Sequence, residues 1–264
     1  ASLKALGNKD LTWETTNKIN LGIELGLLKQ AFYVDFNYYN EKTVDLVNSV
    51  TIRSSTGFTT YVDNIGKLRK TGFEINMRSN LISKGNLFLA LFANLAHNED
   101  KLLEIAQSLK DYNNQVNDHF TNSSRYDGSN TKPFRQFEEG GSLTSIFGVR
   151  SLGIDPASGN EILVKKDGTL TDLWNANDQV ILGNEEPKAK GSFGMNATYK
   201  NFSLFVTFSY EWGGQIYNQT LVDKVENVNI RTTNVDKRVL KERWKEPGDI
   251  AKYRKINLGI ANQS

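Results

Sequence analysis

The sequence predicts an all-β fold: an antiparallel sheet that forms part of a transmembrane β-barrel, with long loops that contain short helices. Three hairpins carry this prediction. In each hairpin, apolar residues occupy every second position on both sides of a tight turn, which is typical of strands with one apolar and one polar face. The strands reach about ten residues, longer than the usual five or six of soluble proteins and close to the roughly nine to eleven that cross a bilayer at a tilt.

The hairpins are expected near residues 16–39, 70–97 and 188–212. Their tight turns contain Lys29, Lys84-Gly85 and Lys200-Asn201. We predict that apolar residues of all three hairpins share the outer face of one continuous sheet, because the period-two pattern is unbroken. The residues that test this prediction are Leu21, Ile23, Leu89, Leu91, Leu204 and Val206.

Long polar segments separate and follow the hairpins. Short turns at one end and long loops at the other are typical of bacterial barrels, in which the short turns are periplasmic. Residues 97–190 and 213–264 are therefore predicted to be long extracellular loops. Helical spacing indicates a helix over Glu99–Leu109 and helix in part of Leu221–Trp244, and Asp167-Gly168 indicates a short hairpin.

Composition excludes several classes of protein. The chain has 264 residues, 38% of them hydrophobic, and no apolar run approaches the roughly 18 residues of a transmembrane helix. A net charge of +2, with the basic residues dispersed, does not support nucleic-acid binding. Because cysteine is absent, disulfides, thiolate metal sites and cysteine nucleophiles are excluded.

A series of motifs resembles the SusC/RagA family of TonB-dependent outer-membrane transporters. The first is Gly7–Thr16, in which Lys9 replaces the usual proline of that family. The later ones follow in the family's order along nearly the whole chain. They are Asp35–Thr43, Asn64–Gly66, Lys70–Glu74, Gly153–Pro156, Asp167-Gly168, Gly183-Asn184, Tyr199–Phe202, Arg243-Trp244 and Pro247–Asp249.

The resemblance implies a transporter in the outer membrane of a Gram-negative bacterium that imports nutrients, either glycans or peptides. It further implies a SusD-like surface lipoprotein over the loops, contact with outer-membrane lipid, and a TonB complex acting through an N-terminal region. The plug domain and the final barrel strands of the family have no counterpart here. The chain is therefore expected to be an internal fragment of the later part of the barrel.

Signatures of catalysis are not found. His97 and His119 are expected to be loop residues without a catalytic role, and no nucleophile elbow or metalloprotease motif occurs. We expect no enzyme activity, no cofactor and no metal. Asp155, Asp167 and Asp172 are interpreted as turn residues rather than calcium ligands, because their spacing fits no EF-hand.

Polar residues between the apolar positions are expected to face the barrel lumen. Charges of both signs with many amides suit a hydrated path or contact with a plug. This set comprises Glu24, Asp35, Asn37, Lys70, Glu74, Asn76, Arg78, Asn80, Asn94, Asn196 and Glu211.

Aromatic residues in or near the long segments are the candidate substrate-binding residues. Trp174 is the first choice, with Tyr217 and Trp212 after it, because flat rings suit sugar rings or peptide side chains. Trp212 also ends a strand, where an aromatic girdle at the membrane interface is the stronger interpretation. Trp244, in the Arg243-Trp244 motif, is interpreted as loop core.

A second class of protein remains open at this point. A soluble carbohydrate-binding or adhesin β-sandwich also has strands with alternating faces. It would bury Ile19, Leu21, Leu87 and Leu89 between two sheets of this chain. The two interpretations therefore differ in whether the apolar face is covered.

Overall fold

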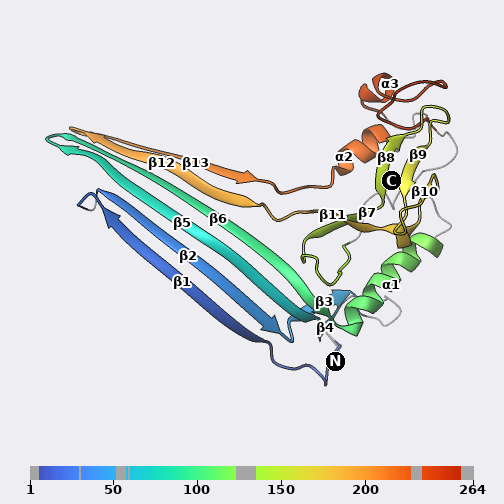
Figure 1. The fold of residues 1–264 in the computed structure, drawn as a ribbon, viewed down its shortest axis with the longest axis horizontal. Helices are drawn as coiled ribbons and strands as arrows, with labels where there is room; N and C mark the ends of the chain where they lie inside the picture. Colours follow the sequence, from blue (N-terminus) through green and yellow to red (C-terminus); the bar gives the residue numbers. More distant parts are fainter. Residues whose placement is uncertain are drawn as a thin grey trace. The chain divides into compact units, whose positions relative to one another are not determined.

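In the computed structural model, the strands of the three hairpins form one six-stranded antiparallel sheet in the order β1-β2-β5-β6-β12-β13 (Figure 1). The structure describes residues 6–29, 31–51, 58, 60–122, 135–226 and 234–256. The chain divides into two compact units. Unit 1 holds the large sheet and comprises residues 1–109, 137–144 and 184–215, and unit 2 comprises residues 110–136, 145–183 and 216–264.

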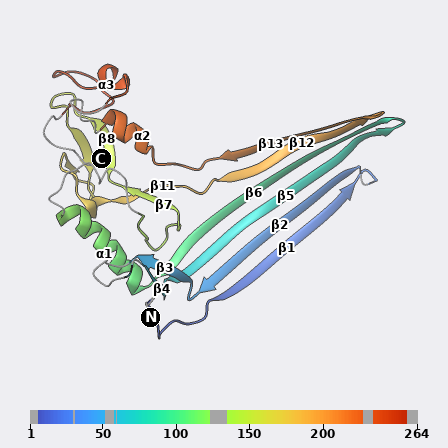
Figure 2. The ribbon, with the colours of Figure 1, turned by 180° about the vertical axis from the view of Figure 1, so that it is seen from behind.

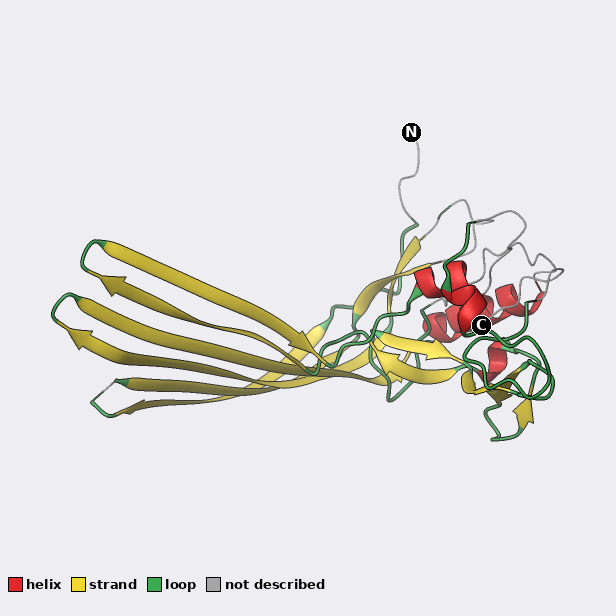
Figure 3. Ribbon diagram, turned by 90° about the horizontal axis from the view of Figure 1, so that it is seen from above, coloured by secondary structure: helices red, strands yellow, loops and turns green. Residues whose placement is uncertain are grey.

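The three hairpins have long strands and short turns. Strands β1 (Thr15–Leu27) and β2 (Phe32–Val44) form the first, and β5 (Gly66–Lys84) and β6 (Leu87–Ile105) form the second. Strands β12 (Ala189–Tyr199) and β13 (Phe202–Trp212) form the third. The three tight turns lie at the same end of the sheet, as Figure 3 shows.

The helix expected over Glu99–Leu109 is wrong in its position. β6 continues to Ile105, and helix α1 spans Gln107–Asn122. The reason is cross-strand pairing: β5 begins at Gly66 and pairs with β6 up to Ile105. Local spacing alone favours a helix here, and the ladder of hydrogen bonds with β5 overrides it.

The two faces of the large sheet differ in chemistry, as predicted. One row of paired residues crosses all six strands on the apolar face: Leu25, Val34, Met77, Ala93, Phe193 and Phe208. The adjacent row lies on the opposite face: Glu24, Asp35, Asn76, Asn94, Ser192 and Ser209. The same register places Leu21, Ile23, Leu89, Leu91, Leu204 and Val206 together on the apolar face, which confirms that prediction.

The apolar face carries no covering layer among the described residues. Ile19 is 63% exposed, Leu21 62% and Leu87 38%, while Leu89 is half-buried. A β-sandwich would bury all four in its core, so this alternative is wrong for the part of the chain that the structure describes. The described helices include none with the length and apolar character needed to cross a membrane.

The core of unit 1 lies at the end of the sheet away from the tight turns. Ile65, Leu68, Leu102 and Ile105 are buried there. The segment 137–144 pairs with this end, because Leu102 N donates to Gly141 O at 2.7 Å and Gly140 N donates to Leu102 O at 2.7 Å. A small hairpin, β3 (Val47–Thr51) and β4 (Thr60–Asn64), joins β2 to β5.

Unit 2 consists of short elements. Strands β7 (Ser145–Gly148) and β11 (Val180–Asn184) pair, and β8 (Arg150–Ile154), β9 (Glu161–Val164) and β10 (Leu170–Thr171) form a small sheet. The hairpin predicted at Asp167-Gly168 joins β9 to β10. The helices are α1, α2 (Gln219–Leu221), a π turn (Val222–Glu226) and α3 (Arg238–Lys241), with a 3₁₀ turn at Ala176–Asp178 (Figure 2).

Candidate functional site

The polar face of the large sheet carries charges of alternating sign in register. Lys18 pairs with Glu41, Glu41 with Lys70, and Lys70 with Asp100 across β1, β2, β5 and β6. Opposite charges on facing positions attract, and like charges repel. The alternation of charge therefore favours this register of the four strands, and the charged groups lie on the polar face.

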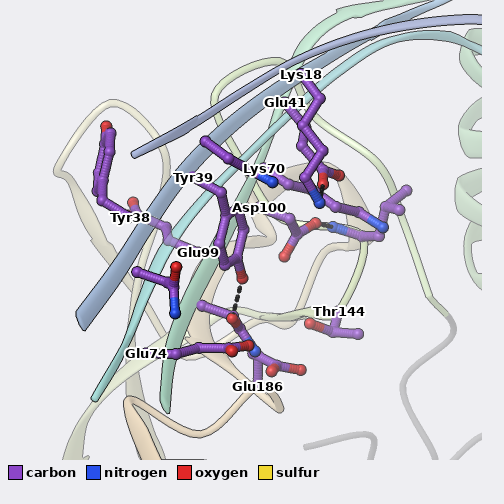
Figure 4. Close-up of a pocket in the computed structure, with 14 residues that line it drawn as sticks. Lys18, Tyr38, Tyr39, Glu41, Lys70, Glu74, Glu99, Asp100, Thr144 and Glu186 are labelled. Atoms are coloured by element: carbon purple, nitrogen blue, oxygen red, sulfur yellow. Dashed lines mark hydrogen bonds and ion pairs between the residues drawn. The ribbon is translucent and has the colours of Figure 1, made fainter. Parts of the chain in front are cut away.

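A concavity of about 650 Å³ lies on this face of unit 1, near the end away from the tight turns (Figure 4). Its volume falls in the range of small-molecule sites, about 300–1,000 Å³. Carboxylates outnumber lysines among the lining residues. The lining includes Lys18, Asn20, Asn37, Tyr39, Glu41, Lys70, Glu74, Asn98, Glu99, Asp100, Leu143, Thr144 and Glu186.

One wall of the pocket is an ion pair over an aromatic ring. Lys18 Nζ lies 2.5 Å from Glu41 Oε1 and 5.4 Å from the centre of the Tyr39 ring. Lys18 is about half exposed, so the pair contributes little to stability. Its effect is to fix the position of the Lys18 ammonium group at the pocket wall.

Tyr39 lies across the sheet because Gly72 leaves room for its ring. The Tyr39 hydroxyl donates to the Asn98 side-chain oxygen. A Cβ on Gly72 would lie 2.5 Å from the Tyr39 hydroxyl oxygen and 2.4 Å from the His97 carbonyl oxygen. Only glycine fits this close approach of ring and backbone, so the residue opposite Tyr39 decides the shape of the pocket floor.

Asp100 attaches the 137–144 segment to the pocket rim. Its carboxylate accepts hydrogen bonds from Ser142 Oγ at 2.5 Å and from Leu143 N at 2.8 Å. Thr144 Oγ1 in turn donates to Asn184 Oδ1 at 2.6 Å. These hydrogen bonds hold the segment against the large sheet, so that Leu143 and Thr144 line the pocket.

The remaining polar side chains of this face are linked by amide hydrogen bonds. Asn37 Nδ2 and Asn76 Nδ2 both donate to Asp35, at 2.8 and 3.1 Å. Asn94 Nδ2 donates to Ser192 Oγ at 2.9 Å. The register places every residue of the predicted lumen-facing set on this face, which confirms that they share one face.

Sequence reasoning missed part of the pocket. Lys70, Glu74 and Asn37 were predicted to face inward, whereas Tyr39, Asn98 and Asp100 were not singled out. The last two fall where the strand was expected to end. The alternation of side chains continues from Leu95 through His97, and this pattern could have placed Asn98 and Asp100 on the polar face of a longer strand.

The three candidate substrate-binding residues lie elsewhere. Trp212 ends β13, is 70% exposed and belongs to the apolar face, so it does not line the pocket. Trp174 packs against the buried cluster of Val116 and Ala176 in unit 2. Tyr217 is half-buried and precedes α2. Substrate contact by these residues stays a prediction.

Trp244 has the loop-core role that the sequence suggested. Its indole Nε1 donates to Pro156 O at 2.9 Å, and its ring covers Gly159. The adjacent Arg243 is buried and donates to three backbone carbonyls, those of Arg254, Val225 and Glu226. The Arg243-Trp244 motif therefore joins the C-terminal segment to the turn at 155–159 within unit 2.

The histidines are not loop residues. His97 lies in β6, with its Nδ1 2.6 Å from Lys188 O and its ring centre 5.3 Å from that of Phe73. His119 belongs to α1. The expected loop position was wrong for both, because β6 and α1 extend over residues that were assigned to a loop. The absence of a catalytic role stays a prediction.

The turn aspartates of unit 2 are satisfied within their own turns. Asp155 accepts from Ser158 Oγ at 2.6 Å and from Ala157 N at 3.0 Å, and these hydrogen bonds lower the pKa of Asp155. Asp167 accepts from Thr169 Oγ1 and Thr169 N, which lowers the pKa of Asp167 in the same way. Hydrogen bonding to the charged form explains both shifts.

Comparison with known proteins finds TonB-dependent receptors of similar sequence. No family model matches. TonB-dependent receptor P39 of Formosa agariphila is 26% identical over 97% of this chain and 27% of its own length. TonB-dependent receptor P3 of the same organism is 26% identical over 84% of this chain and 22% of its own length. TonB-dependent receptor SusC of Bacteroides thetaiotaomicron is 30% identical over 37% of this chain and 10% of its own length.

Solved structures show the same fold. The structure of the RagAB peptide transporter matches with a TM-score of 0.73 at 20% identity, over 100% of this chain and 28% of the matched chain. The RagAB peptide importer in its closed-closed state matches with a TM-score of 0.73 at 22% identity, over 99% of this chain and 28% of the matched chain. The chain spans about a quarter of the length of the two Formosa agariphila receptors.

Proposed function

We infer that the chain belongs to the SusC/RagA family of TonB-dependent receptors, and we propose that it is a barrel segment of a transporter that imports nutrients across the outer membrane of a Gram-negative bacterium. One observation carries the proposal: an uncovered apolar face and a polar face lie opposite each other on six strands of at least 11 residues. Such a sheet fits between lipid and a hydrated lumen. Relatives that are receptors, and structural neighbours that are transporters, support the proposal and favour transport over catalysis.

The polar face is proposed to line the lumen, with its pocket on the path of the cargo. Glycans and peptides both present hydroxyl, amide or ammonium donors, and the excess of carboxylates in the pocket offers acceptors to them. The RagAB neighbours are peptide transporters, and the resemblance to the SusC/RagA family implies either glycans or peptides, so the proposal keeps both classes of cargo.

The partners follow from the family. A SusD-like surface lipoprotein is proposed to cover the long segments 97–190 and 213–264, and a TonB complex to act through an N-terminal region. Within these segments Trp174 and Tyr217 are the proposed ring-stacking contacts, since loops carry specificity on rigid scaffolds. Trp212, on the apolar face, is better suited to the membrane-interface girdle.

The experiment uses the full-length transporter that carries this segment. Glu74→Gln removes one pocket carboxylate, and Glu24→Gln is the matched control, because Glu24 lies on the polar face outside the pocket. We expect the protein in the outer-membrane fraction, with uptake lowered by Glu74→Gln and unchanged by Glu24→Gln at equal abundance. Equal uptake by the two variants would show that the pocket does not lie on the path of the cargo. Absence of the wild-type protein from the outer membrane would refute the proposed function.

A further inference from the structure

The apolar face of the large sheet contains a groove. Its volume is about 490 Å³, and it is lined by residues of β2, β5, β6, β12 and β13. Ala93 forms its floor, because this small residue pairs with Met77 on one side and Phe193 on the other. The groove is also lined by the large side chains of Phe32, Leu91 and Phe208. The lining is almost wholly apolar, which suits a hydrocarbon occupant.

The groove lies at a defined distance from the tight turns. Met195 lines it and precedes Lys200 on the same hairpin, about 16 Å away at a rise of roughly 3.3 Å per residue. A strand tilt of about 40° reduces this to a depth of about 13 Å. One leaflet of a hydrocarbon core about 30 Å thick extends about 15 Å. The end of the groove nearest the turns therefore lies within the depth of the single leaflet next to the turns.

Positive charge gathers at the tight turns. Each contains one exposed lysine: Lys29, Lys84 and Lys200. Within the described parts of the chain, none of the three forms an ion pair with a carboxylate. Lys200 N donates to Asn86 O at 2.9 Å, so the turn of β12–β13 lies beside the turn of β5–β6 and brings Lys84 and Lys200 to neighbouring turns. Lys200 Nζ is 5.4 Å from the centre of the exposed Tyr199 ring.

Groove and lysines together have the chemistry of one kind of partner. Cations at the membrane surface attract phosphate groups of anionic lipids, and an aromatic ring with a polar end suits the interface. We propose that the groove holds an acyl chain of an anionic phospholipid of the periplasmic leaflet, with the lipid phosphate between Lys84 and Lys200. This inference rests on the proposed function, which places the tight turns at the periplasmic side.

A protein segment fits these observations less well. An apolar helix in the groove would leave the turn lysines without an anionic partner, whereas a phospholipid satisfies both features at once. Phe32 at the start of β2 and Ser79 of β5 line the groove on the turn side.

The test compares two matched variants of the full-length transporter. Ala93→Phe fills the groove, and Ala189→Phe is the control, because Ala189 lies on the same face beside Trp212, on the side of the groove away from the turns. Purified protein is incubated with dioleoyl phosphatidylglycerol, and retained lipid is measured by native mass spectrometry. We expect Ala93→Phe to lower lipid retention at least tenfold, because loss of the burial of about two methylene groups changes the binding free energy by that much. We expect Ala189→Phe to leave lipid retention unchanged.

A second variant does not depend on packing. Lys84→Gln with Lys200→Gln alters only exposed side chains, so folding is preserved, and we expect it to lose the preference for phosphatidylglycerol over phosphatidylcholine. Equal retention by the two alanine variants, or an unchanged preference in the lysine variant, would overturn the inference. Lipid retention and lipid preference are both measured on protein recovered from the outer membrane, so either of these negative results leaves the proposed function intact. Failure of the protein to reach the outer membrane refutes the proposed function.

Discussion

Replacing Asp100 with alanine should release the segment 137–144 from the pocket rim. Asp100 accepts hydrogen bonds from Ser142 Oγ at 2.5 Å and Leu143 N at 2.8 Å, and both are partly buried. Hydrogen bonds to a charged group contribute about 1.5–3 kcal/mol each. Because the site is partly solvated, the two hydrogen bonds together are taken to contribute as much as one buried bond. Asp100→Ala should therefore lower the local stability by about 2 kcal/mol.

Hydrogen exchange of the full-length transporter measures this loss directly. A loss of about 2 kcal/mol corresponds to roughly 30-fold faster exchange, at about 1.4 kcal/mol per tenfold. The effect should be greatest at the amides of Leu143 and Thr144, since Leu143 N donates to Asp100 and Thr144 N donates to Ser142 Oγ at 3.1 Å.

Glu99→Ala is the matched control for this measurement. Glu99 precedes Asp100 on β6 and lines the same pocket, but the hydrogen bonds from Ser142 Oγ and Leu143 N go to Asp100. Exchange of the 137–144 amides should therefore keep its wild-type rate in Glu99→Ala. Equal rates in the two variants would refute the assignment of Asp100 as the residue that holds this segment.

Three further predictions concern unit 2. Gly159→Ala should destabilise the 155–159 turn by about 1–3 kcal/mol, because the new Cβ would lie 2.4 Å from the Trp244 ring. Limited proteolysis should detect this loss of stability. Gly168→Ala is the control, since Gly168 also has a positive φ but a Cβ there would meet open space. Hydrogen bonds from Arg238 lower the pKa of Asp236 to about 2 from 3.8. The stabilising contribution of Asp236 is therefore complete above pH 3.8 and is lost as pH falls through about 2. Hydrogen exchange of the α3 amides, corrected for its intrinsic pH dependence, should follow this titration in the wild type and should not do so in Asp236→Asn. Trp174→Ala in the full-length transporter should lower uptake at normal outer-membrane abundance; unchanged uptake removes Trp174 from the site, and lost abundance shows a packing role against Val116 and Ala176.

The alternation of residue types determines the hairpins and their faces by itself. In a strand, successive side chains point to opposite faces, so a run such as Ile19, Leu21, Ile23 already implies one apolar face before any partner is known. Turn residues such as Gly85-Asn86 mark where each strand reverses. Local information is sufficient for these features because both depend on neighbours within a few residues.

Tertiary pairing decided the extent of β6 and the composition of the pocket. Residues 99–105 have helical spacing, yet they form strand because β5 offers a hydrogen-bonding edge that reaches Gly66. Register across four strands then brings Lys18, Glu41, Lys70 and Asp100 into one row, and Gly72 makes room for Tyr39. The hydrogen bond from Trp244 to the Pro156 carbonyl likewise connects residues that are 88 positions apart in the chain. Such contacts depend on which segments meet in space, and no local pattern contains that information.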